Sequence, residues 1–189
     1  MTDKIDVIII GAGIAGITTA YYLQKNFPDI KYKIIDSRSA VGGTWDQMRF
    51  PGVRADNDMY TYGFSFNPWQ GPIIGKGQDI KNYINDTAEK FNIKKNILFD
   101  TKVISSSWKI NQWTTKTNHK NFTSQYVIFC TGSRDRDKPH LPKFKDENKY
   151  QGKIVHTQNW GDTDYKDKSV TIIGSGCTAI TMAPSRIKE

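Results

Sequence analysis

The feature that most constrains the fold is a glycine-rich loop near the N-terminus. Gly11-Ala12-Gly13-Ile14-Ala15-Gly16 has the pattern G-x-G-x-x-G and lies between a β-branched run at 6–10 and a helical pattern at 14–26. A second β-like run at 32–36 follows, so the segment is expected to be a β-α-β unit, whose crossover makes its strands parallel. The sequence therefore predicts an α/β fold built on a parallel sheet.

The residues of this loop suit the binding of a dinucleotide. Gly11 permits the tight turn, Gly13 lets backbone approach a pyrophosphate, and Gly16 lets the helix pack closely on the strand. Asp36 lies 20 residues after Gly16, at the end of the next strand, where a carboxylate accepts hydrogen bonds from a ribose. Loop, context and acid together predict a Rossmann-like dinucleotide site. The alternative is a glycine-rich turn that only packs a helix on a strand.

The same design recurs near the C-terminus. Gly174-Ser175-Gly176-Cys177-Thr178-Ala179 follows a β-like run at 169–173 and precedes a helix start. Two such loops favour two different dinucleotides, as in flavoproteins that take hydride from a nicotinamide. The alternative of a purely structural turn is stronger here, because the residue that would read a ribose lies beyond Glu189.

The segments between the loops complete the expected organisation. Residues 37–77 are rich in Gly, Pro and aromatic residues without periodicity, and are expected to form a wall of a ligand site. A surface helix is expected at 79–91, with Asp79 as its N-cap. Three β-like runs within 97–117 and 122–130 predict a small inserted β-meander that leads back to a buried strand. Proline residues near 140 indicate a linker.

Composition excludes several functional classes. The net charge is +8, but 21 of the 27 basic residues are scattered lysines and no nucleic-acid-binding motif accompanies them, so nucleic-acid binding is not expected. No apolar run is long enough for a membrane span or a signal peptide, which favours a cytoplasmic location. Cys130 and Cys177 lack the spacing of a metal clip or redox pair, so both are expected to be buried thiols and no metal site is expected.

Further motifs carry a family resemblance. They are Gly42-Gly43-Thr44-Trp45-Asp46, the run at 50–56, the run at 58–61, and Phe64-Ser65-Phe66, followed by Tyr150-x-Gly152-x-x-x-His156-Thr157-x-x-Trp160. With them the chain resembles the class B flavoprotein monooxygenases, most closely the Baeyer-Villiger type related to the ethionamide-activating monooxygenase. The last motif is similar to the Baeyer-Villiger fingerprint F-x-G-x-x-x-H-x-x-x-W, although Tyr150 stands in place of Phe and Gly161-Asp162 follows where Pro is frequent. The alternative for this motif is an ordinary packed linker.

The resemblance implies two cofactors, FAD and NADPH, and places residues at each. The residues expected to contact FAD form the pyrophosphate loop, the ribose acceptor, the flavin-side segment, the backbone at the adenine and the turn after the last strand. In chain order they are Gly11, Gly13, Ala15 and Gly16 of the loop, Asp36 at the ribose, Gly43, Thr44, Trp45, Asp46 and Gln47 of the flavin-side segment, Val103 at the adenine, and Thr131 and Gly132 of the last turn. Asp56 would lie near the flavin ring, and the alternative is that it is only a carboxylate in a turn. Arg54 and Ala55 would lie where the nicotinamide cofactor arrives. The phosphates of NADPH would meet Gly174, Ser175, Gly176, Cys177, Thr178, Ala179, Ile180 and Thr181.

The implied reaction is the insertion of one oxygen atom of O2 into a small-molecule ketone, or the oxidation of a nitrogen or sulfur centre. The arginine that the family requires for catalysis would lie beyond the chain end, so no catalytic residue is assigned. The expected domains are an FAD-binding segment at 1–140, a linker at 141–168 and the start of an NADP-binding domain at 169–189. The chain is therefore expected to be an incomplete, inactive fragment. The alternatives are an FAD-binding module or remnant without catalysis and, less favoured because no C-x-x-C is present, a flavin disulfide reductase.

Overall fold

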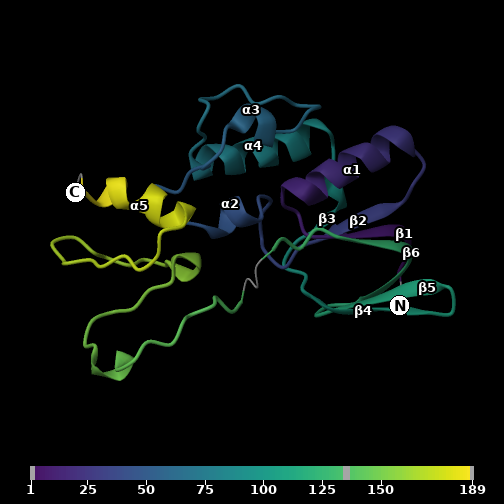
Figure 1. Cartoon of the computed structure of the whole chain (residues 1–189). Helices are drawn as coiled ribbons and strands as arrows, with labels where there is room; N and C mark the ends of the chain where they lie inside the picture. Colours follow the sequence, from purple (N-terminus) through teal and green to yellow (C-terminus); the bar gives the residue numbers. More distant parts are fainter. Residues whose placement is uncertain (1–2, 134–136, 188–189) are drawn as a thin grey trace.

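The structure is a computed structural model that describes residues 3–133 and 137–187. Positions 1–2, 134–136 and 188–189, which the expected domains include, lie outside the described residues. The described chain contains a six-stranded sheet in the order β3-β2-β1-β6-β5-β4 (Figure 1). Its strands are β1 (Asp3–Ile10), β2 (Tyr32–Ile35), β3 (Ile97–Leu98), β4 (Val103–Lys109), β5 (Gln112–Thr117) and β6 (Asn121–Phe129).

The expected β-α-β unit is confirmed. Strands β1 and β2 pair in parallel, with Ile9 opposite Ile34, and helix α1 (Ile14–Asn26) connects them. Strand β3 extends the parallel sheet beyond β2. On one face of the sheet, Val7, Ile9 and Ile34 pack in a cluster with buried residues of α1 such as Ile17, which removes their apolar surface from water.

A second helix, α4 (Gly77–Lys90), packs with α1 over the same face of the sheet (Figure 1). Its start differs from the prediction, because Lys76 and not Asp79 is the N-cap. A backbone bridge between Arg54 and Lys76, with a 2.8 Å hydrogen bond from the Gly77 N–H to the Val53 carbonyl, fixes the chain there and lets the helix begin earlier. Asp79 lies in the first turn, where its charge suits the helix dipole.

The expected β-meander is present as β4, β5 and β6, which pair antiparallel in sequence, and β6 then pairs in parallel with β1. The meander lies on the side of β1 and β2 opposite the helices (Figure 1), where Phe122 packs with Ile8 and Ile10. The prediction of a buried return strand is wrong for the second half of β6. Tyr126 there is 61% exposed, because no described element packs over it.

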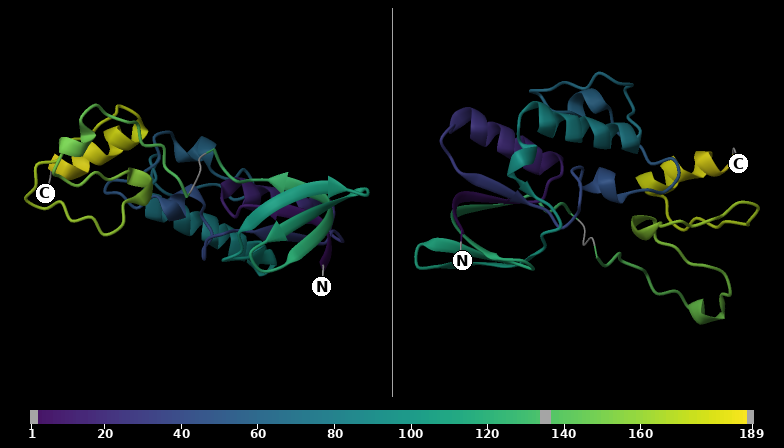
Figure 2. Two further views of the ribbon diagram at one scale, coloured as in Figure 1. Left: turned by 90° about the horizontal axis from the view of Figure 1, so that it is seen from below. Right: turned by 180° about the vertical axis from the view of Figure 1, so that it is seen from behind.

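Two short helices interrupt the segment at 37–77, α2 (Thr44–Gln47) and α3 (Met59–Tyr62). Beyond the meander, the residues that the structure describes form two 3-10 turns, η2 (Glu147–Lys149) and η3 (Thr157–Asn159), before helix α5 (Cys177–Ile187). Helix α5 and the meander lie at opposite ends of the molecule (Figure 2). Among the described residues, no helix is long and apolar enough to cross a membrane.

The strand expected at 169–173 is wrong. These residues form no ladder in the described chain, and the side chain of Ile173 is exposed. A strand needs a hydrogen-bonded neighbour, and none is available to this run. Helix α5 is held instead by side-chain packing, because Met182 contacts Met48 and Phe50 near α2. The second glycine loop therefore precedes a helix but does not follow a strand.

Candidate functional site

The first glycine loop lies where two parallel strands end. The N–H of Gly11, directly after β1, donates a 2.8 Å hydrogen bond to the carbonyl of Ile35, the last residue of β2. The N–H of Cys130, directly after β6, donates at 2.8 Å to the carbonyl of Ile10. Three strand ends are thus tied together at the carboxyl edge of the sheet, which is where open α/β folds bind their ligands.

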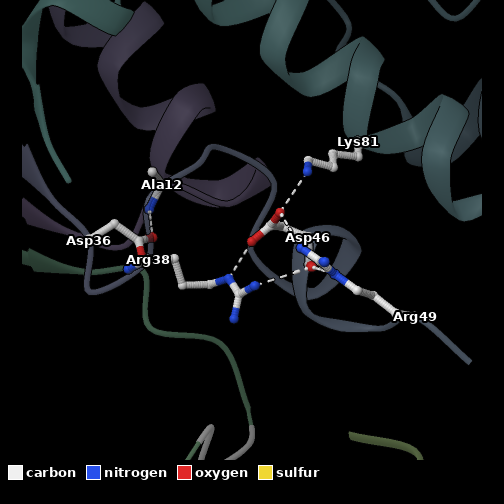
Figure 3. Close-up of polar contacts among 6 residues, drawn as sticks. All are labelled: Ala12, Asp36, Arg38, Asp46, Arg49 and Lys81. Atoms are coloured by element: carbon white, nitrogen blue, oxygen red, sulfur yellow. Dashed lines mark hydrogen bonds and ion pairs between the residues drawn. The ribbon is translucent and has the colours of Figure 1, made fainter. Parts of the chain in front are cut away.

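Asp36 lies against this loop as the sequence predicted for a ribose acceptor. One of its carboxylate oxygens accepts a 2.7 Å hydrogen bond from the N–H of Ala12, and the other accepts at 2.9 Å from the N–H of Arg38 (Figure 3). The residue is only 3% exposed. Two backbone donors therefore fix the orientation of a buried carboxylate beside the turn of the loop.

The three glycines of the loop have different structural surroundings. A Cβ at Gly16 would overlap the carbonyl oxygen of Gly11, and a Cβ at Gly11 would overlap that of Cys130, so the fold itself requires both glycines. At Gly13 a Cβ would meet the backbone of Gly43, with the Cα at 3.5 Å and the nitrogen at 4.0 Å, which are ordinary contact distances. Packing within the described chain therefore does not account for a glycine at position 13. A ligand that approaches the backbone closely would account for it.

A cavity of about 210 Å³ brings several predicted residues together. Gly11, Asp36, Val103 and Thr131 all line it, although they come from four separate segments of the chain. The remaining lining residues were not predicted: Ile10, Ile35, Ser37, Thr101, Lys102 and Asp137. Among these, Lys102 and Asp137 form an ion pair between exposed side chains. The one sequence signal for any of these residues is that Lys102 precedes Val103, which is itself predicted to contact the cofactor.

Asp46, which is expected to line the flavin side, is the centre of a cluster of ion pairs. Its side chain is 3% exposed and forms ion pairs with Arg38, with Lys81 of α4 at 2.7 Å and, more weakly, with Arg49 at 3.8 Å (Figure 3). Burial alone would raise the pKa of the Asp46 carboxyl. The hydrogen bonds and positive charges of Lys81 and Arg38 outweigh burial and hold this pKa below its ordinary value. Sequence reasoning missed both cations.

The flavin-side segment approaches the first loop through Gly42 and Gly43. The N–H of Gly42 donates a 3.1 Å hydrogen bond to the carbonyl of Ala12. Helix α2, which begins at Thr44, therefore starts beside the loop. Trp45 of α2 is half-buried, and its indole N–H donates at 3.1 Å to the hydroxyl of Tyr62, which leaves its ring in a fixed orientation.

Other predicted residues lie apart from the 210 Å³ cavity. Arg54, Ala55 and Asp56 do not line it. Ala55 is buried in the core and its N–H bonds to the carbonyl of Gly75, while Arg54 and Asp56 are exposed. Gly132, after the last strand, has a φ of +78° and is exposed. The roles proposed for these residues stay predictions.

The second glycine loop lines a separate cavity of about 880 Å³. Gly174, Gly176, Thr178 and Ala179 line it together with linker residues, which include Tyr150, Gly152, His156, Thr157 and Trp160. The loop and the linker motif are thus brought together. Ser175, Cys177, Ile180 and Thr181 are not part of the lining. Cys177 is exposed and Cys130 is only partly buried, so the expectation of two buried thiols is wrong.

Comparisons with known proteins agree with this architecture. A family model described as pyridine nucleotide-disulphide oxidoreductase matches residues 5–186. The FAD-containing monooxygenase EthA from Mycobacterium tuberculosis is 40% identical over 193 residues, which covers 98% of this chain and 40% of that protein. Cyclohexanone monooxygenase with bound epsilon-caprolactone superposes with a TM-score of 0.87 at 25% identity, covering 100% of this chain and 38% of that one. The complex of OTEMO with FAD and NADP gives 0.82 at 27% identity, covering 97% and 37%.

These comparisons confirm the expected resemblance to flavin monooxygenases and the expected α/β fold. The chain spans about 40% of the length of the curated relative that it matches.

Proposed function

The chain belongs to the pyridine nucleotide-disulphide oxidoreductase family, and from this premise we propose that it binds FAD at the carboxyl ends of β1 and β2. The observation that carries the proposal is the cavity at which Gly11, Asp36, Val103 and Thr131 meet. The same four residues are the ones that the sequence predicts to contact FAD. That EthA is named an FAD-containing monooxygenase, and that OTEMO was solved with FAD, supports the same cofactor.

The residues fit FAD on the chain's own geometry. The N-terminus of α1 offers backbone N–H groups and a positive dipole end, which suit a pyrophosphate, and the absence of a side chain at Gly13 leaves room for close approach. Asp36, held by two backbone donors, would accept hydrogen bonds from ribose hydroxyls. The backbone of Val103 would meet the adenine. When bound, FAD supplies the redox chemistry.

Further residues would orient the flavin end and exclude water from it. Trp45 presents a flat apolar ring whose indole N–H is already satisfied by Tyr62. Asp46 and its cations hold α2 against α4, so that Trp45 keeps its position.

For a protein of the relatives' length we assign monooxygenase activity with NADPH as the hydride donor. One oxygen atom of O2 would be inserted into a ketone, as in a Baeyer-Villiger oxidation, or transferred to a nitrogen or sulfur centre. Among family members, a disulfide reductase is the weaker assignment, because Cys130 and Cys177 are the only cysteines and lie far apart in the sequence. The loop at Gly174 would receive the NADPH phosphates.

A second candidate is an FAD-binding module without turnover. It is favoured by one observation, the missing strand at 169–173, because the second loop then lacks the sheet that normally orders a dinucleotide site. The two candidates differ in a simple assay of the purified chain. Flavin binding with no NADPH oxidation supports the module, whereas NADPH oxidation that depends on FAD and O2 supports the enzyme.

Replacing Asp36 with asparagine is expected to weaken FAD binding about tenfold or more, because charged hydrogen bonds to the ribose contribute about 1.5–3 kcal/mol each. Quenching of FAD fluorescence during titration measures the affinity, and ADP should compete with FAD at the same site. Asp29→Asn, a change of the same kind at an exposed turn, is the control. Unchanged affinity in Asp36→Asn, with a normal circular dichroism spectrum, would exclude the ribose role.

A further inference from the structure

The tip of the β4–β5 hairpin is an unusual turn. Ile110 and Asn111 connect the strands, and both have positive φ angles, of 50° and 57°. Asparagine tolerates this left-handed conformation, but a β-branched residue does not. The side chain of Ile110 is 94% exposed, so it gains no burial that would offset the strain. The folded chain therefore derives no stability from isoleucine at this position.

Two tryptophans lie close to this tip, one on each strand of the hairpin. Trp108 and Trp113 face each other across the hairpin, with ring centroids 5.8 Å apart in an edge-to-face arrangement. Trp108 is exposed. An aliphatic tip followed by a pair of tryptophans matches the order in which a bilayer changes from hydrocarbon to headgroups, because indole rings prefer the interface.

The hairpin and the strand that follows it carry charged residues of a single sign. Residues 103–133 contain Lys109, Lys116 and Lys120 but no aspartate or glutamate, in a chain that has 19 acidic residues elsewhere. Lys109 is adjacent to the tip and Lys116 lies farther along β5, and both are exposed. Lysines near a surface of anionic lipids contribute about 1 kcal/mol each to binding.

We propose that the tip of the β4–β5 hairpin docks onto a bilayer surface that carries anionic lipids, with Ile110 inserted and the lysines over the headgroups. A protein partner fits less well, because a stable interface buries about 1,000 Å² or more with complementary shape. A protruding two-residue tip offers no such surface. The hydrocarbon region of a bilayer can take up the Ile110 side chain without a pocket of matching shape.

The docking site and the cofactor site are separate. Strand β4 begins at Val103, which lines the 210 Å³ cavity, and runs for seven residues before the tip, a rise of about 20 Å. The hairpin also projects from the end of the molecule opposite α5 (Figure 2). The proposal therefore does not depend on FAD binding, and docking would leave the cofactor cavity open.

The test is Ile110→Asn, because this change has opposite effects on folding and docking. Asparagine suits the left-handed turn, so the melting temperature should rise by about 2–4 °C. Loss of the buried isoleucine should lower the affinity for vesicles of phosphatidylcholine with phosphatidylserine about tenfold or more. Co-sedimentation of the purified chain with these vesicles, and with vesicles of phosphatidylcholine alone, measures both lipid dependence and affinity.

Two further variants complete the design. Ile73→Asn changes an exposed isoleucine on another surface and should bind vesicles like the parent chain. Replacing Lys109 and Lys116 with alanine should weaken binding about fivefold for each lysine. The proposal is overturned if the parent chain does not bind anionic vesicles, binds neutral vesicles equally well, or binds unchanged after Ile110→Asn. A dimer that Ile110→Asn dissociates, without vesicle binding, would instead identify a second copy as the occupant.

Discussion

Replacing Gly16 with alanine is expected to destabilise the fold by about 3 kcal/mol, although alanine is the better helix former. The added methyl group would overlap the carbonyl oxygen of Gly11. That oxygen is a backbone atom and the methyl carbon is bonded directly to the Cα, so neither can move away without a shift of the backbone. Helix α1 would have to shift away from β1. Thermal or urea unfolding followed by circular dichroism measures the change.

Gly13→Ala in the same loop is the matched variant, and the opposite outcome is expected. Its methyl group makes only ordinary contacts with the backbone of Gly43, so stability should change by no more than about 1 kcal/mol. FAD affinity should fall about tenfold to a hundredfold, because the pyrophosphate loses charged hydrogen bonds to the backbone. If Gly13→Ala bound FAD normally, the pyrophosphate would not lie on this loop. If Gly16→Ala folded normally, the close helix–strand contact would be incorrect.

Replacing Asp46 with asparagine is expected to lower the free energy of unfolding by about 3 kcal/mol at neutral pH. The change leaves Arg38 and Lys81 together without the buried negative charge that both of them contact. It also loosens α2 from α4. The control is Glu89→Gln, which breaks an exposed ion pair with Lys94 and should leave the melting temperature nearly unchanged.

The effect of Asp46 should depend on pH in a defined direction. Its folded pKa lies below the ordinary value, so the unfolded chain binds the proton more readily. The stabilisation is therefore complete above about pH 4 and is lost as the pH falls through the folded pKa. Unfolding curves of the parent chain and Asp46→Asn should converge at acid pH. A difference that stays constant below pH 4, down to strong acid, would contradict the assigned charge interaction.

The sequence predicted those features that depend on neighbouring residues. The β-α-β unit and the positions of Gly11 and Asp36 follow from a local pattern of strand, turn and helix, and their proximity follows from parallel pairing. Arg38 and Lys81 were missed because the acid that joins them, Asp46, is separated from Lys81 by 35 residues and nothing in its local pattern indicates burial.

The wrong predictions have the same origin. The run at 169–173 has the composition of a strand, but forming one depends on a partner that the pattern cannot supply. Likewise, the apolar run at the end of β6 does not tell whether any element covers Tyr126. The start of α4 was misplaced because a backbone bridge to Arg54, not a side-chain cap, determines it.

The position of Arg38 has a consequence for ligand selectivity. Its backbone N–H holds Asp36, and its guanidinium holds Asp46, so one residue joins the acid beside the first loop to the short helix that carries Trp45. A displacement of Arg38 would therefore alter both contacts at once. The two halves of a bound dinucleotide would therefore be sensed cooperatively, and a mononucleotide that fills only one half would leave the other half of the site less well organised.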